Sequence, residues 1–354
     1  MSEPLKILIT GASGFIGSFL CEEGLRRGMS VWAGMRRTSS RRWLQNEWLQ
    51  FAWIDMGNPD KLHDQLAALK QKIGRWDYVV HAAGATKCMH ETDFERANFD
   101  CTVNLVNALR DLDMTPRLFI YMSSLSVLGP AAEPAHGTPT RDYAMLSASD
   151  TPRPNTAYGR SKLKSEQWLQ TLDPSAFPYI IMRPTGVYGP RERDYYLQAK
   201  SICRHIDFAV GFQPQVITFV YVRDVVGAVY AAVDRTEEGR LGNIVGGIYH
   251  LSDGCDYSSR AFSDYIQACL HIRRVAHVKA PLWLLRTVCT VSGGWAKLSG
   301  KASTLNTDKY NILCQRNWKC DIRPLLTRLE YTPQWNLERG TRETMDWYRR
   351  EGWL

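Results

Sequence analysis

The amino-acid sequence predicts an α/β fold: a doubly wound parallel sheet with helices on both faces, joined to a smaller, discontinuous, mainly helical lobe. Three observations support this prediction. Short apolar runs alternate with helical patterns through the first half of the 354 residues, as in βαβ units. A glycine-rich turn follows the first apolar run. Beyond residue 185 the alternation gives way to longer helical patterns rich in Trp and Tyr.

The elements of the first half follow from the apolar runs and the turns that separate them. The expected strands are 6–10, 30–35, 51–55, 78–84, 117–124 and 179–185. The expected helices are 15–28, 59–73, 92–112 and 157–172. Right-handed crossovers distribute these helices over both faces of one parallel sheet.

The second half is expected to interleave with the nucleotide-binding fold. Residues 216–233 and 242–254 look strand-like, so we assign 1–185 and about 214–254 to the sheet domain. Residues 186–213 and 255–354 then form the second lobe. Residues 280–291 are too short to cross a bilayer and carry Arg286, which indicates an amphipathic helix lining a lobe or pocket. The polar loop 131–155 is either a lid or an exposed surface loop.

Composition narrows the function classes. The nine cysteines include no C-x-x-C pair, which favours reduced thiols in the cytoplasm over a disulfide framework. The eight histidines show no ligand spacing, so we expect no metal site. The net charge of +8 comes from dispersed basic residues, so we expect no nucleic-acid partner. The chain enters a strand within a few residues, and we expect no signal peptide and no membrane partner.

The glycine-rich turn is the first candidate site. Gly11, Gly14 and Gly17 follow a buried strand and open an apolar helix. Glycines in this context let backbone N–H groups and the helix N-terminus approach a pyrophosphate closely. The pattern therefore predicts a Rossmann dinucleotide site. The residues of its cofactor-binding turn are Gly11, Ser13, Gly14, Phe15, Ile16 and Gly17.

The end of the second strand indicates which dinucleotide binds. An acidic residue there holds a free ribose, whereas a 2′-phosphate needs cations. The sequence has Arg36 and Arg37 at this place and no carboxylate. A guanidinium suits a phosphate in geometry and charge. We therefore predict NADP as the preferred cofactor, with NAD as the alternative. The competing explanation is that the arginines belong to a solvated loop and bind no phosphate.

The segments "TGASGFIG", "HAAG", "SSLSVLGP" and "YGRSK" occur in an order that resembles the extended short-chain dehydrogenase/reductase family, also described as NAD-dependent epimerase/dehydratase. The resemblance extends over nearly the whole chain. It implies a small-molecule substrate and a homodimer formed through helices of the Rossmann domain. The further cofactor contacts it implies are Asp55 and Met56 near the adenine, Ala82, Ala83 and Gly84 along the cofactor, Asn98 supporting the active-site strand, and Pro184 and Thr185 beside the nicotinamide.

The resemblance also assigns catalytic residues. Tyr158 and Lys162 stand at i and i+4, a spacing that any solvated helix can show, but here they match the family's Y-x-x-x-K pair. Ser124 aligns with the catalytic Ser/Thr, and Ser123 is the neighbouring alternative. A free tyrosine titrates near 10, so we expect Lys162, aided by oxidised nicotinamide, to lower the pKa of Tyr158 and suit it to proton transfer. Tyr158 and Lys162 also contact the cofactor.

The branch of the family is less sharply indicated. Many sugar-nucleotide enzymes carry an asparagine where this chain has Gly186, whereas the N-terminal segment looks more like dihydroflavonol reductases and "SSLSVLGP" like 3β-hydroxysteroid dehydrogenases. The first hypothesis is an NAD(P)-dependent oxidoreductase, transferring hydride between NADP(H) and a ketone or secondary alcohol. The alternatives are an NAD-dependent nucleotide-sugar epimerase/dehydratase and a non-catalytic NADP-sensing protein.

Overall fold

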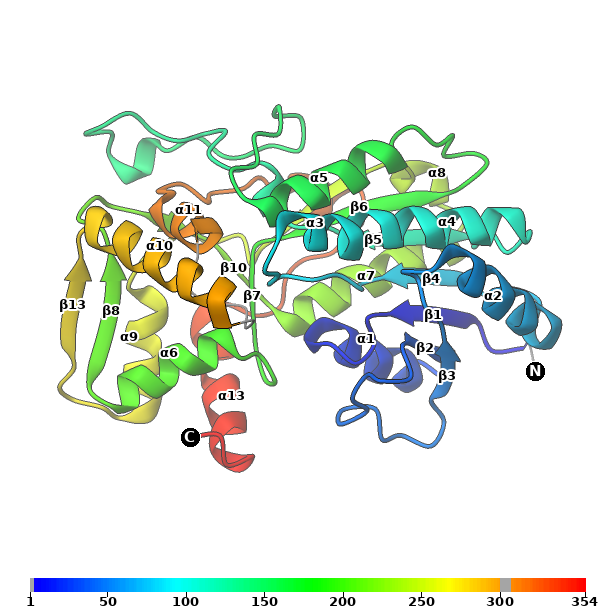
Figure 1. Ribbon diagram of the computed structural model, residues 1–354, viewed down its shortest axis with the longest axis horizontal. Helices are drawn as coiled ribbons and strands as arrows, with labels where there is room; N and C mark the ends of the chain where they lie inside the picture. Colours follow the sequence, from blue (N-terminus) through cyan, green and yellow to red (C-terminus); the bar gives the residue numbers. More distant parts are fainter. Residues whose placement is uncertain (1–2, 300–306) are drawn as a thin grey trace.

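The computed structural model describes residues 3–299 and 307–354 (Figure 1). Seven parallel strands form its central sheet in the order β11-β6-β5-β4-β1-β2-β3. Their bounds are β1 Lys6–Thr10, β2 Ser30–Met35, β3 Gln50–Trp53, β4 Tyr78–His81, β5 Leu118–Met122, β6 Tyr179–Pro184 and β11 Ile248–Leu251. The predicted doubly wound α/β fold is confirmed.

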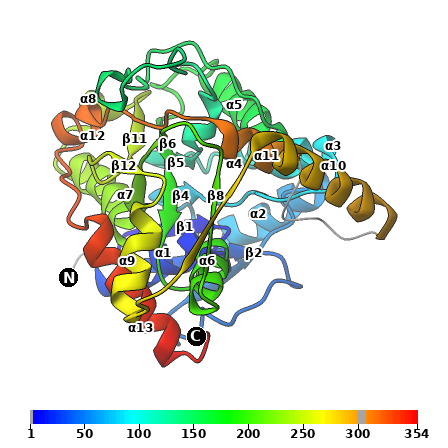
Figure 2. The same ribbon diagram turned by 90° about the vertical axis from the view of Figure 1, so that its left-hand side faces the viewer.

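Helices cover both faces of this sheet because its strands are apolar on both sides. Ile7 and Ile9 of β1 pack into one core with the first helix, while Leu8 between them packs into the other core. Figure 2 shows the strands between the two helical layers. The layers are α1 Phe15–Arg26 and α7 Val222–Glu237 on one face, and α2 Pro59–Ile73, α4 Cys101–Asp111 and α5 Ala157–Leu169 on the other.

The strand order reverses between β1 and β4. Ligands of open α/β sheets bind beyond the carboxyl ends of the strands at such a reversal. In this chain Thr10 ends β1 and His81 ends β4, and the two are register partners. The candidate site therefore lies at the edge where these strands end.

The remaining elements are short strand pairs and helices. Three pairs form, β7–β10, β8–β13 and β9–β12, so this part contains more strand than expected. The strands are β7 Gly186–Tyr188, β8 Ile206–Val210, β9 Val216–Ile217, β10 Phe219–Tyr221, β12 Tyr257–Ser258 and β13 Ala276–Ala280. The helices are α6 Asp194–Cys203, α8 Leu241–Ile244, α9 Ala261–Leu270, α10 Leu282–Ser299, α11 Thr307–Cys314, α12 Arg323–Thr327 and α13 Leu337–Arg350.

The strand-like assignment of 216–233 is wrong over most of its length. Only the beginning forms β9 and β10, and the chain is helical from Val222. A continuous apolar run fits a buried helix as well as a strand, and its length favours a helix. Likewise 242–254 contains the end of α8 before β11 begins.

The expected helix 92–112 is interrupted by a wider turn. It consists of α3 Glu91–Phe94, a π-helical segment Glu95–Asp100 and then α4. Such π-helical turns are rare and frequent at functional sites. This one contains Asn98, whose buried side chain belongs to the candidate site.

Candidate active site

The glycine turn is too crowded for side chains. Gly11 has φ +68°, and a Cβ on it would lie 2.7 Å from the backbone of Ala83. A Cβ on Gly17 would lie 2.2 Å from the carbonyl oxygen of Gly11. Gly14 is the N-cap of α1, where no side chain caps the helix. The N-terminal N–H groups of α1 are therefore available to a phosphate.

A chain of hydrogen bonds joins the ends of β1 and β4. Nδ1 of His81 lies 2.7 Å from Oγ1 of Thr10, and Nε2 lies 3.0 Å from Oγ1 of Thr102. Thr102 donates its own proton to the carbonyl oxygen of Asn98 (2.6 Å), so it must accept from Nε2–H of His81. Burial, reinforced by Lys162, lowers the pKa of His81 to about 3. A neutral His81 thus fixes the strand edge.

Asn98 supports the loop after β4. Its Oδ1 accepts a hydrogen bond from the backbone N–H of Ala85 at 2.8 Å, and its Nδ2 donates to Ser161 Oγ at 2.8 Å. A Cβ on Gly84 would lie 2.7 Å from Asn98 Oδ1 and 3.1 Å from Lys162 Nζ. The structure therefore brings Asn98, Gly84 and Lys162 together, with Ala82 and Ala83 partly exposed beside them.

Ser124 and Tyr158 meet beyond the end of β5. Oγ of Ser124 accepts hydrogen bonds from N (3.2 Å) and Oγ (3.0 Å) of Ser126. Its single proton is left to donate, and its hydrogen bond to Tyr158 favours the phenolate. Ser123, the alternative, turns away and donates to Glu166. The geometry favours Ser124.

Without a dinucleotide, the surroundings of Tyr158 favour its neutral phenol. Burial raises the pKa of Tyr158 to about 12, and only the hydrogen bond to Ser124 opposes it. The Lys162 ammonium donates to the carbonyl oxygen of Met122 at 2.8 Å and lies 4.9 Å from the centre of the Tyr121 ring. Tyr158 is consequently neutral at pH 7, and the lowering of its pKa by Lys162 together with oxidised nicotinamide stays a prediction.

Lys162 is itself perturbed. Burial lowers its pKa to about 8, opposed by the charge of Glu166. Glu166 is paired with Arg183 at 2.6 Å, and both side chains are almost fully buried. Sequence reasoning missed this pair. Its signal was an arginine inside the apolar strand run 179–184, because a buried charge needs a partner.

Two caps hold the N-terminus of α5, and sequence reasoning missed them too. Oγ1 of Thr156 accepts from the N–H of Gly159 at 2.9 Å, as an N-cap does. Oδ2 of Asp308 accepts from the backbone N–H groups of Ala157 (2.9 Å) and Tyr158 (3.4 Å). Thr156 was recognisable as a residue preceding a helix. Asp308 is distant in sequence and had no signal.

The region expected to hold the adenosine lies at the ends of β2 and β3. Arg36 is exposed and Arg37 stacks over Trp53, with its guanidinium carbon 5.5 Å from the ring centre. The charge of Asp55 raises the pKa of the half-buried Cys101 thiol and the charge of Arg36 lowers it, so the three residues are neighbours. The next residue, Met56, accepts a hydrogen bond through its carbonyl oxygen from Asn104 at 2.9 Å.

The segment after β6 reaches the same edge of the sheet. Pro184 ends β6, and Thr185 donates its backbone N–H to Leu251 at 3.0 Å. Oγ1 of Thr185 is buried and has no partner in the part of the chain that the structure describes. An unsatisfied hydroxyl at this edge, together with the glycine turn that a Cβ would fill, fits a bound dinucleotide.

The loop 131–155 is anchored at several points. Nδ2 of Asn317 donates to the carbonyl oxygens of Ala132 (2.8 Å) and Ala144 (2.7 Å). Tyr143 donates its hydroxyl to Pro214 at 3.0 Å. These bonds tie the loop to two distant segments, around Pro214 and around Asn317.

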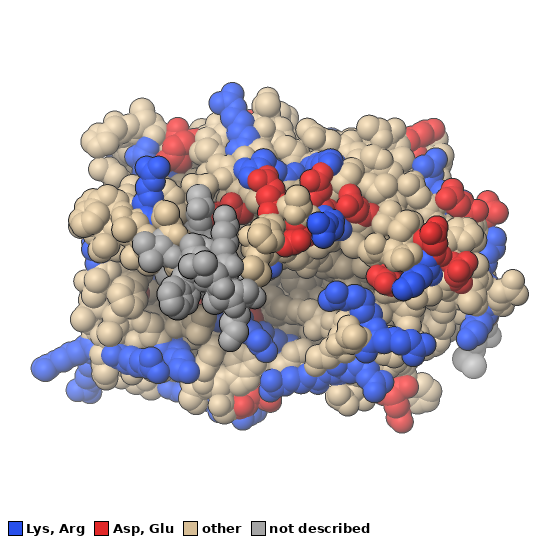
Figure 3. Space-filling view, viewed as in Figure 1, with Lys and Arg blue, Asp and Glu red and all other residues tan. Residues whose placement is uncertain are grey.

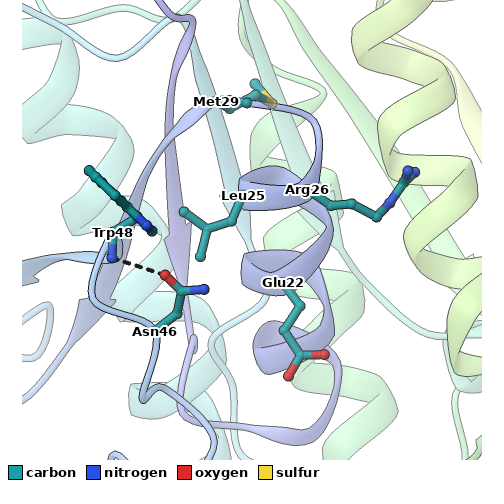
Figure 4. A pocket seen from close by; sticks show the side chains of 7 residues that line it. Glu22, Leu25, Arg26, Met29, Asn46 and Trp48 are labelled. Carbon is teal, nitrogen blue, oxygen red and sulfur yellow. Dashed lines mark hydrogen bonds between the residues drawn. The ribbon is translucent and has the colours of Figure 1, made fainter.

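Figure 3 shows a hollow in this face of the molecule, with basic side chains along its lower edge and acidic ones along its upper edge. A separate groove of about 550 Å³ lies at the other end of α1 (Figure 4). Its lining residues are Glu22, Leu25, Arg26, Gly28, Met29, Asn46 and Trp48. They belong to the carboxyl end of α1 and the loop before β3, away from the glycine turn.

Comparison with known proteins identifies the family of this chain. Residues 7–246 match the model of the NAD dependent epimerase/dehydratase family. Ceramide reductase of Caulobacter vibrioides is 24% identical over 98% of this chain and 96% of its own length. A decarboxylating sterol-4-alpha-carboxylate 3-dehydrogenase of Dictyostelium discoideum is 23% identical over 96% of this chain and 99% of its own length.

Solved structures show the same fold. UDP-glucuronic acid 4-epimerase from Bacillus cereus in complex with NAD has a TM-score of 0.72 at 22% identity, covering 98% of this chain and 99% of that one. The Bordetella bronchiseptica enzyme WbmG in complex with NAD has a TM-score of 0.74 at 18% identity, covering 99% and 96%.

The sheet, the glycine turn and the Tyr158–Lys162 pair are those of a dinucleotide-dependent enzyme. The chain belongs to the NAD dependent epimerase/dehydratase family, whose members are extended short-chain dehydrogenases/reductases. The predicted family is confirmed, and the chain is an enzyme that uses a nicotinamide dinucleotide.

Proposed function

We propose that this enzyme transfers hydride between NADP(H) and a ketone or secondary alcohol on a largely apolar substrate. The observation that carries the proposal is the meeting of Ser124, Tyr158 and Lys162 at the sheet edge where the glycine turn also ends. Gly11, Gly14 and Gly17 would receive the pyrophosphate. When bound, the dinucleotide supplies the hydride exchange.

Proton transfer falls to the chain's own residues. In the reductive direction Tyr158, neutral at pH 7, gives its phenolic proton to the substrate oxygen. Ser124 has a single proton to donate, and in the complex it directs this proton to the substrate oxygen and so orients that oxygen. Lys162 provides a nearby cation, and its ammonium can exchange Met122 for ribose hydroxyls.

The preference for NADP depends on Arg36. In the described residues its guanidinium has no hydrogen bond, ion pair or ring contact, whereas Arg37 is stacked on Trp53. A 2′-phosphate beside Asp55 would find an uncommitted cation in Arg36. This supports a role for Arg36 in reading the phosphate.

The substrate class follows from Gly186. A Cβ there would lie 2.5 Å from the hydroxyl of Tyr195, so the asparagine of many sugar-nucleotide enzymes would collide. Tyr195 is fixed in an aromatic cluster, 4.8 Å from Phe262 between ring centres. Two relatives are named for lipid substrates, a ceramide and a sterol carboxylate. These observations favour an apolar carbonyl compound over a nucleotide sugar.

The organisation of the molecule is part of the proposal. We assign 186–213 and 255–354 to substrate binding, supported by the tight packing of α9 with α6 and α13 outside the sheet.

A homodimer remains our expectation by family resemblance. All nine cysteines are free thiols, which supports a reducing compartment such as the cytoplasm.

The test is a substrate screen that follows NADPH absorbance with apolar ketones and nucleotide sugars. Tyr158→Phe should lower kcat by about 10²–10⁴-fold with the dissociation constant for NADPH unchanged, because only the proton donor is lost. Tyr179→Phe, at the amino end of β6 and so at the opposite edge of the sheet from the site, is the matched control and should keep full activity.

Two results would contradict the proposal. Turnover of a nucleotide sugar without net NADPH consumption, by protein that retains dinucleotide through purification, would identify the epimerase alternative. Unchanged activity in Tyr158→Phe would remove the proposed chemistry altogether and leave the NADP-sensing alternative.

A further inference from the structure

One face outside the central sheet is apolar and exposed. It is formed by β8, β13 and the first half of α10, on the left of Figure 1 and turned toward the viewer in Figure 2. We call it the β8–α10 face. Its exposed apolar residues are Ile206, Phe208, Phe212, Val278, Leu282, Trp283, Leu284 and Val288.

Strand alternation separates this face from the packed side of the β8–β13 pair. Phe208 and Val278 are register partners, so their side chains lie on the same side of the two strands. The opposite side faces α9, where Asp207 accepts hydrogen bonds from Ser263 (2.7 Å) and contacts His277 (3.1 Å). Strand β8 is thus covered on the side of Asp207, while Phe208 is 63% exposed on the other.

Helix α10 continues the same surface. Its Leu285 and Cys289 are buried, but Trp283 is 69% exposed. A Cβ on Gly211, directly after β8, would lie 3.4 Å from Cδ2 of Leu282. The residues that follow β8 therefore meet the start of α10. The segment is a helix with one buried and one exposed side, as expected of an amphipathic helix, and its lining of a lobe or pocket stays a prediction.

The charges around the β8–α10 face are of one sign. Its cations are Arg204, Arg273, Arg274 and Arg286, all exposed. None of them forms an ion pair within residues 3–299 and 307–354. The one carboxylate in 204–212 and 271–290 is the buried Asp207. Figure 3 shows basic side chains gathered over the lower ends of β8 and β13, with no acidic ones among them.

We propose that the β8–α10 face binds the surface of an anionic lipid bilayer. Exposed Trp, Phe and Leu enter the boundary between headgroups and acyl chains, and surrounding Lys and Arg attract anionic headgroups. A second copy of the chain fits less well, because a two-fold contact would set these cations against themselves. No described helix is long and apolar enough to span a bilayer. The proposal departs from our expectation that the protein has no membrane partner.

This surface is connected to the candidate active site. Helix α10 packs on α11, and Asp308 of α11 caps the helix that carries Tyr158. The β8–α10 face is therefore linked to the Tyr158 helix through two packed helices. The inference stands on surface chemistry alone and does not require the proposed reaction.

The test is flotation of the full-length protein with vesicles of phosphatidylglycerol and phosphatidylcholine, and with vesicles of phosphatidylcholine alone. We expect binding to the anionic vesicles that weakens with added salt, and much weaker binding to the zwitterionic ones. The double variant Phe208→Ser/Trp283→Ser should lower the partition coefficient about tenfold or more. Arg274→Gln/Arg286→Gln should do the same on anionic vesicles only, since each basic side chain contributes a factor of about 5.

Trp48→Ser is the control, because Trp48 is 74% exposed but lies beside α1, away from this face. It should bind vesicles as the unchanged protein does. Absence of vesicle binding, or binding that neither double variant weakens, would overturn the proposal. So would a dimer in solution that Phe208→Ser/Trp283→Ser dissociates without any vesicle binding. Thermal melts followed by circular dichroism check that the variants fold. If the apolar variant unfolds, the charge variant, which changes exposed side chains only, tests whether the β8–α10 face binds anionic vesicles.

Discussion

Lys162 is an almost completely buried amine in the candidate active site, and its burial opposes its positive charge. Removing an ammonium from water disfavours its charged form, which is why its pKa falls from 10.5 to about 8. The nearby carboxylate of Glu166 is committed to Arg183 and compensates only in part. The folded protein without cofactor therefore carries a destabilising charge that a bound dinucleotide can use.

This conflict predicts a pH-dependent stability difference. A depressed pKa means that the unfolded chain binds more protons between pH 8 and 10.5, so stability rises with pH in that window. Lys162→Met removes this contribution. The free energy of unfolding of the variant, minus that of the unchanged protein, should therefore fall by about 3 kcal/mol from pH 7 to pH 10.5. Urea unfolding at both pH values measures it, and a pH-independent difference would contradict the assignment.

Arg36 gives a second prediction for a single side chain. Arg36→Ala should weaken NADPH binding by about ten- to a hundredfold, the loss of one charge-assisted contact, and leave NADH binding unchanged. Arg37→Ala is the control, because Arg37 is stacked on Trp53. Calorimetric titration with both cofactors measures the effect. Equal losses for NADPH and NADH would show that Arg36 does not read the 2′-phosphate.

Among the elements, the β1–α1 turn depends most strictly on its sequence. Gly11 is constrained twice, by a positive φ and by the backbone of Ala83. Gly28 also has a positive φ, +74°, but a Cβ there would meet nothing within 4 Å. The two positions therefore separate the cost of backbone conformation from the cost of close approach.

The expected result is a difference between two variants. Gly28→Ala should cost about 1 kcal/mol of unfolding free energy and leave cofactor binding intact. Gly11→Ala should cost about 2 kcal/mol more and abolish measurable NADPH binding, because strand β4 must move away. Urea unfolding and calorimetry follow both quantities. Similar behaviour of the two variants would argue against the close approach of β1 and β4.

At the scale of the whole molecule, one buried carboxylate fastens the C-terminal segment to the sheet domain. Asp224 at the start of α7 accepts hydrogen bonds from Tyr331 Oη (2.7 Å), Gln334 N (2.8 Å) and Trp335 N (3.0 Å). Gly227, one turn later, leaves room for the Tyr331 ring, whose hydroxyl would lie 2.2 Å from a Cβ. This contact holds α13 in place from a distant part of the sequence.

Asp224→Ala should therefore lower the free energy of unfolding by about 3 kcal/mol, since it leaves buried donors unsatisfied. It should also speed limited proteolysis between α12 and α13. Asp346→Ala, an exposed position on α13, is the control and should change neither. Unchanged stability in Asp224→Ala would mean that the segment is held by its apolar contacts alone.

Local spacing was enough to predict much of this protein. The apolar runs located the strands up to β6, and the glycines at 11, 14 and 17 indicated the dinucleotide site, because these patterns follow from backbone geometry within a few residues. The pairing of Tyr158 with Lys162 is likewise a property of one helix.

Packing between distant segments decided the rest. The choice of Ser124 over Ser123 depends on which hydroxyl Glu166 engages, and the raised pKa of Tyr158 depends on what buries it. The helical state of 222–237 and the apolar exposure of α10 follow from which neighbours cover each run. The sequence specifies the chemical type of each side chain, but its burial and its partners are determined only when the chain folds.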